Sequence, residues 1–145
     1  MPTRTARTAW NGTVAKGGGQ VEFTSSKLGT FDVSFPRRMA EEANGVTSPE
    51  ELIAAAHSSC YSMALAGEVA RAGGSPVQFD VTADVTITQD DKGLNISAIA
   101  LTVRAEVENM DAVQFEQAAQ AAKVGCPVSK ALKAVPISLD AALEN

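Results

Sequence analysis

The two cysteines, Cys60 and Cys126, are the residues of this chain best suited to nucleophilic or redox chemistry. They lie too far apart in the sequence to form a CxxC redox pair or a local zinc knuckle. A metal site that adds His57 has suitable ligand types, but no paired short spacing supports it. Free cysteines are commonly buried and inert, so the pair is either two core thiols or two thiols that meet in the fold and react.

A reactive Cys60 needs a nearby cation. A thiol attacks only as its thiolate, which requires a pKa below the usual value near 8.5. Cys60 follows the predicted helix start at Ser48 by about 18 Å at ~1.5 Å per residue, beyond the reach of the helix dipole. The candidates are His57, one turn back on the same face, and the Arg37-Arg38 pair before the helix. Arginine is the better candidate because its charge is permanent and its fork can hold an oxygen and a carboxylate together.

The helix that carries Cys60 is predicted from Ser48 to about residue 72. Ser48 is a suitable cap, Pro49 fits the first turn, and Glu51 completes the spacing of a capping box, while Gly73 ends the helix. One apolar stripe is expected to face the core, and a second one carries the cysteine. The first holds Leu52, Ala55, Ala56, Ser59, Met63, Ala66 and Ala70, and the second holds Ile53, His57, Cys60, Ala64 and Gly67. Almost nothing between Leu52 and Gly67 is charged, so we expect a partner subunit to cover part of this helix.

The rest of the chain predicts an α+β fold with one domain over residues 1–145. Residues 4–35 alternate as a meander of hairpins, with the cluster Gly17 to Gly19 as a turn, and residues 36–47 are expected to be a surface loop. Two long strands meet at the turn Asp90–Gly93. The remaining expected elements are a helix from Asp111 to Gly125 with Phe115, Ala118, Ala119 and Ala122 buried, a short helix 127–133 and a last strand 135–141.

Composition and charge exclude several partners. Twelve basic and seventeen acidic residues give a net charge of −5, and the basic residues are scattered, so we expect no nucleic-acid partner. No apolar stretch approaches the roughly 18–20 residues that span a bilayer, and the start MPTRTARTAW lacks the apolar middle of a secretory signal. We therefore expect no membrane association and a cytoplasmic location.

Two motifs together resemble one known family. SPEELIAAAHSSCYSMAL at 48–65 and KVGCPVS at 123–129 look like the OsmC/Ohr family of cysteine-dependent organic hydroperoxide reductases. The opening TARTAWNGTVAKGGGQVEFTSSKLG at 5–29 is similar to the OsmC branch in particular. The likeness covers nearly the whole chain. It implies an OsmC-like fold with antiparallel sheets, a long central helix and an intertwined homodimer.

The resemblance also implies a role for each site residue. Cys60 is expected to be the peroxidatic cysteine and Cys126 the resolving one, with Arg38 activating the thiol and Glu50 holding that arginine. The expected substrates are organic hydroperoxides and, more slowly, hydrogen peroxide; an external dithiol, a lipoyl-type protein or thioredoxin, is the expected reductant. No cofactor is implied.

Spacing agrees with a dimeric site. Glu50 and Cys60 are ten residues apart, about 15 Å along a regular helix, so an antiparallel partner helix would bring its carboxylate towards Cys60. The alternative function is a non-catalytic protein that holds a lipid-like ligand in an apolar dimer groove. A thiol hydrolase is disfavoured, because His57 is the only histidine and no acyl-enzyme arrangement surrounds it.

Overall fold

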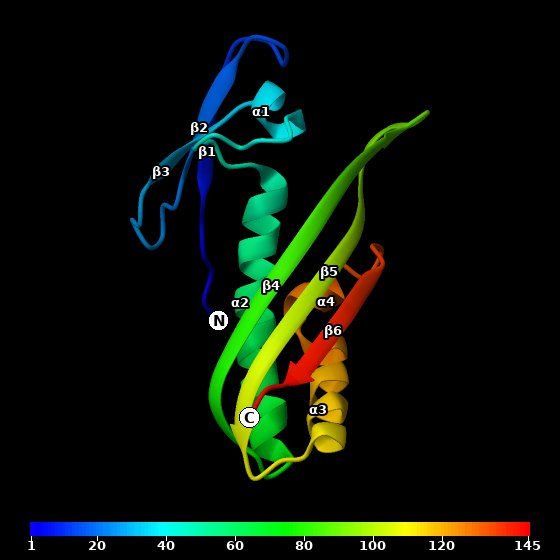
Figure 1. Cartoon of the computed structure of the whole chain (residues 1–145). Coiled ribbons are helices and arrows are strands. Elements are labelled where there is room, and N and C mark those ends of the chain that lie inside the picture. The colour runs from blue at the N-terminus through cyan, green and yellow to red at the C-terminus, as the bar shows by residue number, and fades with distance from the viewer. The chain divides into compact units, whose positions relative to one another are not determined.

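The computed structural model describes all residues from Met1 to Asn145, which form two compact units, Met1–Leu52 and Ile53–Asn145. Figure 1 labels the elements along the chain. The first unit holds strands β1 (Arg7–Asn11), β2 (Gly18–Glu22) and β3 (Thr30–Val33), helix α1 (Phe35–Met39) and the start of helix α2 (Pro49–Arg71). The second holds the rest of α2, strands β4 (Ser75–Asp90), β5 (Gly93–Glu108) and β6 (Ile137–Leu143), and helices α3 (Ala112–Gly125) and α4 (Pro127–Ala131).

The first unit contains the predicted meander, since β1, β2 and β3 pair in sequence order as antiparallel neighbours. The glycine cluster is only partly a turn, because Gly18 and Gly19 belong to β2. Gly19 pairs with Trp10, and a Cβ at Gly19 would lie 2.5 Å from the carbonyl oxygen of Ala9. Close backbone approach therefore requires glycine there, within a strand.

The expected loop over 36–47 begins with a helix instead. Helix α1 starts after Ser34, whose side chain accepts a hydrogen bond from the backbone N–H of Arg37 at 3.3 Å. Pro36 occupies the first turn, where the missing N–H costs nothing. The helix has only five residues, so it gives almost no periodic signal in the sequence, but it fixes the backbone of Arg37 and Arg38.

Helix α2 begins and ends as predicted, except for one contact. Ser48 Oγ accepts from the backbone N–H of Glu51 at 3.1 Å, which is half of the expected capping box. The other half is absent because the Glu51 carboxylate accepts from the Thr47 hydroxyl at 2.6 Å. At the far end Gly73 has a φ of +91°, and the N–H of Gly74 bonds the carbonyl of Val69. No helix in the structure is both long enough and apolar enough to cross a membrane.

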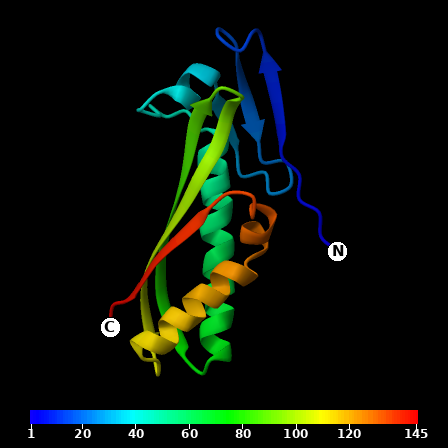
Figure 2. The same ribbon diagram turned by 90° about the vertical axis from the view of Figure 1, so that its right-hand side faces the viewer.

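The second unit is a three-stranded sheet in the order β4, β5, β6, with helices against one face (Figure 2). Strands β4 and β5 form the expected long hairpin, whereas β5 and β6 run parallel. The expectation of purely antiparallel sheets is therefore wrong for this pair. The connection through α3 and α4 is the kind of helical crossover that parallel strands require.

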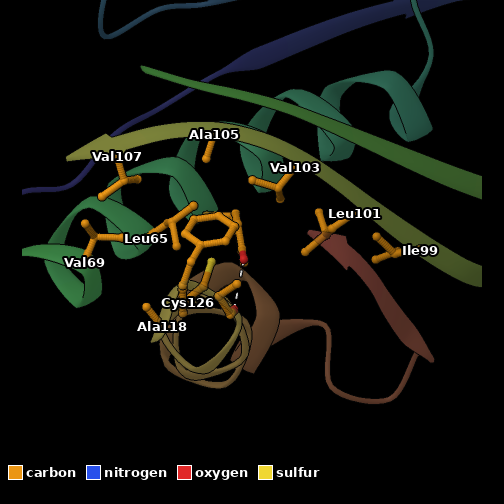
Figure 3. Close-up of a cluster of buried hydrophobic side chains, with 13 residues drawn as sticks. Leu65, Val69, Ile99, Leu101, Val103, Ala105, Val107, Ala118 and Cys126 are labelled. Atoms are coloured by element: carbon orange, nitrogen blue, oxygen red, sulfur yellow. Dashed lines mark hydrogen bonds between the residues drawn. The ribbon is translucent and has the colours of Figure 1, made fainter. Parts of the chain in front are cut away.

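The core of the second unit lies between β5, α3 and α2 (Figure 3). Asp111 caps α3 in a full capping box, and the four predicted side chains of α3 are buried. On α2, however, the buried positions after Leu52 are His57, Tyr61, Leu65 and Val69, while Met63 of the expected core stripe is 73% exposed. The stripe with Tyr61, Leu65 and Val69 removes more apolar area from water than the alanine-rich one.

Candidate active site

Arg38 and Glu50 form a bidentate ion pair within the first unit. Arg38 Nη2 donates to Glu50 Oε1 at 2.7 Å, and Nε lies 3.1 Å from both carboxylate oxygens. Glu50 is only 7% exposed, and its hydrogen bond raises the pKa of the Arg38 guanidinium. Helix α1 supplies the arginine and the first turn of α2 supplies the carboxylate. The pair therefore presents a permanent, oriented positive charge.

An apolar cavity of about 310 Å³ adjoins this pair in the first unit. Arg38 is the charged residue of its lining, and the other walls include Trp10, Val21, Phe35 and Leu52. A pocket with alkyl and aromatic walls and one oriented cation suits a ligand with an apolar body and an oxygen-bearing head.

The two thiols meet in the second unit. Cys60 on α2 is half-buried, whereas Cys126, between α3 and α4, is completely buried; both are free. Each thiol is close enough to shift the pKa of the other, upward for Cys60 and downward for Cys126. The residue pattern alone left open whether the cysteines would meet, and in the structure they are neighbours.

The surroundings act on the two thiols in opposite directions. Burial raises the pKa of Cys60, and the N–H of Val128 offsets this only in part; no cation acts on it. Burial also opposes ionisation of Cys126, but hydrogen bonds from the backbone N–H of Ser129, the Cys60 thiol and the Ser129 hydroxyl lower its pKa. Within one chain, negative charge is therefore best accommodated on Cys126.

His57 is a buried, neutral side chain. Its Nε2 lies 2.7 Å from Ser129 Oγ, and Nδ1 has no hydrogen-bond partner. Burial lowers the pKa of His57, so the imidazole does not supply the cation that Cys60 needs. No group of three or more His, Cys, Asp or Glu side chains is arranged to hold a metal ion.

The predicted site residues thus form two pairs, Arg38 with Glu50 and Cys60 with Cys126. Arg37 is exposed, and it is Arg38 that bonds the Glu50 carboxylate. Sequence reasoning missed Ser129, although it follows Cys126 by the same three positions that separate Cys60 from His57. This shared three-residue spacing was the feature of the sequence that could have indicated the pairing of His57 with Ser129.

Two free thiols in contact on an α+β scaffold define a candidate for dithiol–disulfide chemistry. The chain belongs to the family of OsmC-like proteins, whose model matches residues 42–140. Peroxiredoxin OsmC of Escherichia coli strain K12 is 42% identical over 136 residues, which cover 94% of this chain and 93% of that protein. Organic hydroperoxide resistance protein OhrA of Bacillus subtilis strain 168 is 32% identical over 74% of this chain and 76% of its own length.

Solved structures confirm the OsmC/Ohr fold. An organic hydroperoxide resistance protein OsmC from Legionella pneumophila superimposes with a TM-score of 0.72 at 23% identity, covering 98% of this chain and 99% of its own. The organic hydroperoxide resistance protein OhrB of Bacillus subtilis gives a TM-score of 0.67 at 23% identity, with coverage of 97% and 98%. At this identity the likeness concerns the fold.

Proposed function

We propose that this protein is a cytoplasmic cysteine-based peroxidase that reduces organic hydroperoxides and, more slowly, hydrogen peroxide. The observation that carries the proposal is the contact between a half-buried Cys60 and a fully buried Cys126. The accessible thiol suits attack on substrate, and the buried one suits capture of the oxidised product. The 42% identity to a peroxiredoxin over most of both chains supports the same chemistry.

The proposed reaction uses both sulfurs. The Cys60 thiolate attacks one peroxide oxygen, the O–O bond breaks, and the alcohol leaves with a proton, so that Cys60 becomes a sulfenic acid. The Cys126 thiolate then attacks the Cys60 sulfur, expelling hydroxide that is protonated to water, and a disulfide forms. An external dithiol reduces this disulfide by exchange. We propose a lipoyl-type protein rather than thioredoxin as that dithiol, on the resemblance to the OsmC/Ohr family.

Activation of Cys60 requires a cation, because burial raises the pKa of this thiol within its own unit. We assign this role to the Arg38–Glu50 pair of a second copy of the chain, with two active sites at the interface of a homodimer. The exposed, alanine-rich stripe that includes Ala55, Ala56 and Met63 supports such an interface. The stripe that carries Cys60 is not the exposed one, since His57 packs inside the second unit.

The cavity beside Arg38 supports the preference for organic substrates. Its apolar lining favours an alkyl tail by about 0.8 kcal/mol per buried CH₂. Hydrogen peroxide has no such tail and gains nothing from these walls. Arg38 would meanwhile donate to the peroxide oxygens and stabilise the charge that develops on the leaving alkoxide.

Stopped-flow consumption of cumene hydroperoxide and of hydrogen peroxide, with dihydrolipoamide as reductant, tests the proposal. We expect multiple turnovers, faster with the organic peroxide, and none in Cys60→Ser. Thiols that survive excess peroxide unchanged would overturn the peroxidase. Saturable binding of a fatty acid by such an unreactive protein would instead support the lipid-binding alternative.

A further inference from the structure

Trp10 is held in one orientation by contacts at both ends of its indole. It stands on β1 opposite Gly19 of β2, and a Cβ at Gly19 would lie 3.0 Å from Cε3 of the indole. The six-membered ring therefore occupies the space that the missing side chain leaves. At its other end the indole Nε1–H donates to the carbonyl oxygen of Gly12 at 2.9 Å. A ring fixed in this way forms a rigid surface.

The same ring lines the apolar cavity of about 310 Å³ beside Arg38. Residues of β1, β2 and β3 line this cavity together with residues of α1 and the first turn of α2. Trp10 has the largest side chain of the lining, and Arg38 is its charged group. The volume lies at the lower end of the usual range for ligand pockets. A large, immobile side chain in so small a cavity therefore decides how much room the tail of a ligand has.

Core packing does not account for a tryptophan at position 10. The Trp10 side chain is 42% exposed, whereas Val21, which lines the same cavity, is 6% exposed and belongs to the core. The indole leaves a large apolar surface open, which an aromatic or alkyl group of a ligand could cover. The ring is thus available for contact with a ligand, and its two anchors prevent it from swinging aside to admit a larger one.

We propose that Trp10 is the specificity-determining residue of the cavity beside Arg38. Its fixed indole admits the tail of a compact hydroperoxide, about the size of one aromatic ring, and excludes a second fused ring. This inference rests on the proposed peroxidase cycle, in which Arg38 meets the peroxide oxygens. It adds an upper size limit, set by one side chain, to the preference for organic peroxides over hydrogen peroxide.

A matched pair of substrates tests the size limit: cumene hydroperoxide, and its analogue in which a 2-naphthyl group replaces the phenyl ring. For the unchanged protein we expect the higher kcat/KM with cumene hydroperoxide. In Trp10→Ala the ratio of the two kcat/KM values should shift towards the naphthyl substrate by about tenfold, because the removed ring leaves room for the larger tail. Trp10→Phe, which keeps a ring but has no N–H for Gly12, should give an intermediate ratio.

Phe31→Ala is the matched control. Phe31 stands on β3 of the same sheet and is 44% exposed, but it does not line the cavity. Its substrate ratio should equal that of the unchanged protein. Because the ratio compares two substrates in one preparation, partial unfolding of a variant lowers both rates and leaves the ratio alone. An unchanged ratio in Trp10→Ala, or an equal shift in Phe31→Ala, would overturn the inference even in a protein that turns over peroxide.

Fluorescence supplies a second readout that needs no turnover, because Trp10 is the only tryptophan of the chain. In Cys60→Ser we expect 2-phenylpropan-2-ol, the alcohol product of cumene hydroperoxide, to change the Trp10 emission saturably. Phe31→Ala in the same background should keep this change. Quenching that stays linear in the alcohol concentration would reveal collisions only and would overturn the placement of the tail beside Trp10. Saturable binding to a protein whose thiols reduce no peroxide would leave the role of Trp10 standing and count against the proposed function.

Discussion

Arg38 donates to both carboxylate oxygens of Glu50, with the shortest of these bonds 2.7 Å long, and the carboxylate that receives it is almost fully buried. A flexible arginine on the surface would sample many directions. The Arg38 guanidinium is restricted because two of its nitrogens bond the Glu50 carboxylate. Both residues also stand on helices, Arg38 on α1 and Glu50 in the first turn of α2. The same pair borders an apolar cavity, so a bound peroxide would meet the positive charge in a defined direction.

Arg38→Ala is expected to slow the reaction of Cys60 with organic hydroperoxide by about a hundredfold or more, the usual cost of losing one oriented charge-stabilising donor. Arg38→Lys should recover little of this rate, because an ammonium keeps the charge but lacks the planar fork. The measurement is the alkylation rate of Cys60 against pH, together with stopped-flow peroxide consumption.

Arg37→Ala is the matched control for this series, because Arg37 is exposed and is not the arginine that bonds Glu50. We expect it to behave as the unchanged protein. Equal alkylation profiles for the Arg37 and Arg38 variants would remove the activation mechanism. An effect confined to Arg37→Ala would assign the role to the neighbouring arginine.

Arg38→Ala is also expected to destabilise the fold by about 1–3 kcal/mol, because it leaves a buried carboxylate without its partner. From the sequence alone Arg38 lies in a loop and should contribute little, but the burial of Glu50 changes that expectation. Glu50→Gln in the Arg38→Ala background should recover part of the loss, since a neutral amide costs less to bury. Urea unfolding of the single and double variants measures this difference, and a double variant less stable than Arg38→Ala would contradict it.

Long periodic segments and strong caps allowed most of the fold to be predicted. The bounds of α2, the β4–β5 hairpin and the buried face of α3 follow from alternation, from Ser48 and Asp111, and from glycine stops. Two features of the fold were not predicted, one because its signal is too short and one because it depends on distant segments. Helix α1 is too short to have a period, and the parallel pairing of β6 depends on a crossover that no single segment encodes.

For the candidate site, the sequence supplied the residues but not their arrangement. Cys60, Cys126 and Glu50 stand in motifs that carry the resemblance, whereas Arg38 lies outside them. The structure pairs Arg38 with Glu50 and places Cys60 beside Cys126, and the roles of all four residues stay predictions. The choice between two apolar stripes on α2 went wrong because both have helical spacing. The bulk of Tyr61 decides it in the structure, and Met63 is left on the exposed face.

Cys60→Ser is expected to abolish peroxide turnover, whereas Cys126→Ser should react once and then accumulate oxidised Cys60. Only the first thiol breaks the O–O bond, and the second captures the sulfenic acid before further oxidation. Mass spectrometry of Cys126→Ser after one equivalent of peroxide should show an added oxygen, moving to two and three with excess. Normal turnover of Cys126→Ser with a dithiol would remove the resolving role.

Met63→Lys is expected to weaken self-association strongly, since it places a charge on the exposed apolar stripe of α2 that we assign to the dimer interface. Val113→Lys on α3 is the matched control, because Val113 is 67% exposed and Met63 is 73% exposed. Sedimentation velocity over a dilution series should show a dimer for the control and a smaller or partly unfolded species for Met63→Lys. A folded monomer in the unchanged protein at every concentration would contradict the proposed interface.

Acid should destabilise the second unit through His57. Burial lowers the pKa of this imidazole in the folded state, so below the usual value of about 6.5 the unfolded chain binds the proton first. The contribution of His57 to stability is therefore complete above that pH and is lost as the pH falls from 6.5 towards the lowered folded-state pKa. The slope of the unfolding free energy against pH is at most about 1.4 kcal/mol per pH unit for one proton.

The variant His57→Gln cannot titrate at this position. The difference in unfolding free energy between it and the unchanged protein should therefore vary with pH only below about 6.5. Urea unfolding from pH 8 to pH 5.5 measures that difference, and a difference independent of pH would show that His57 is not held neutral by the core.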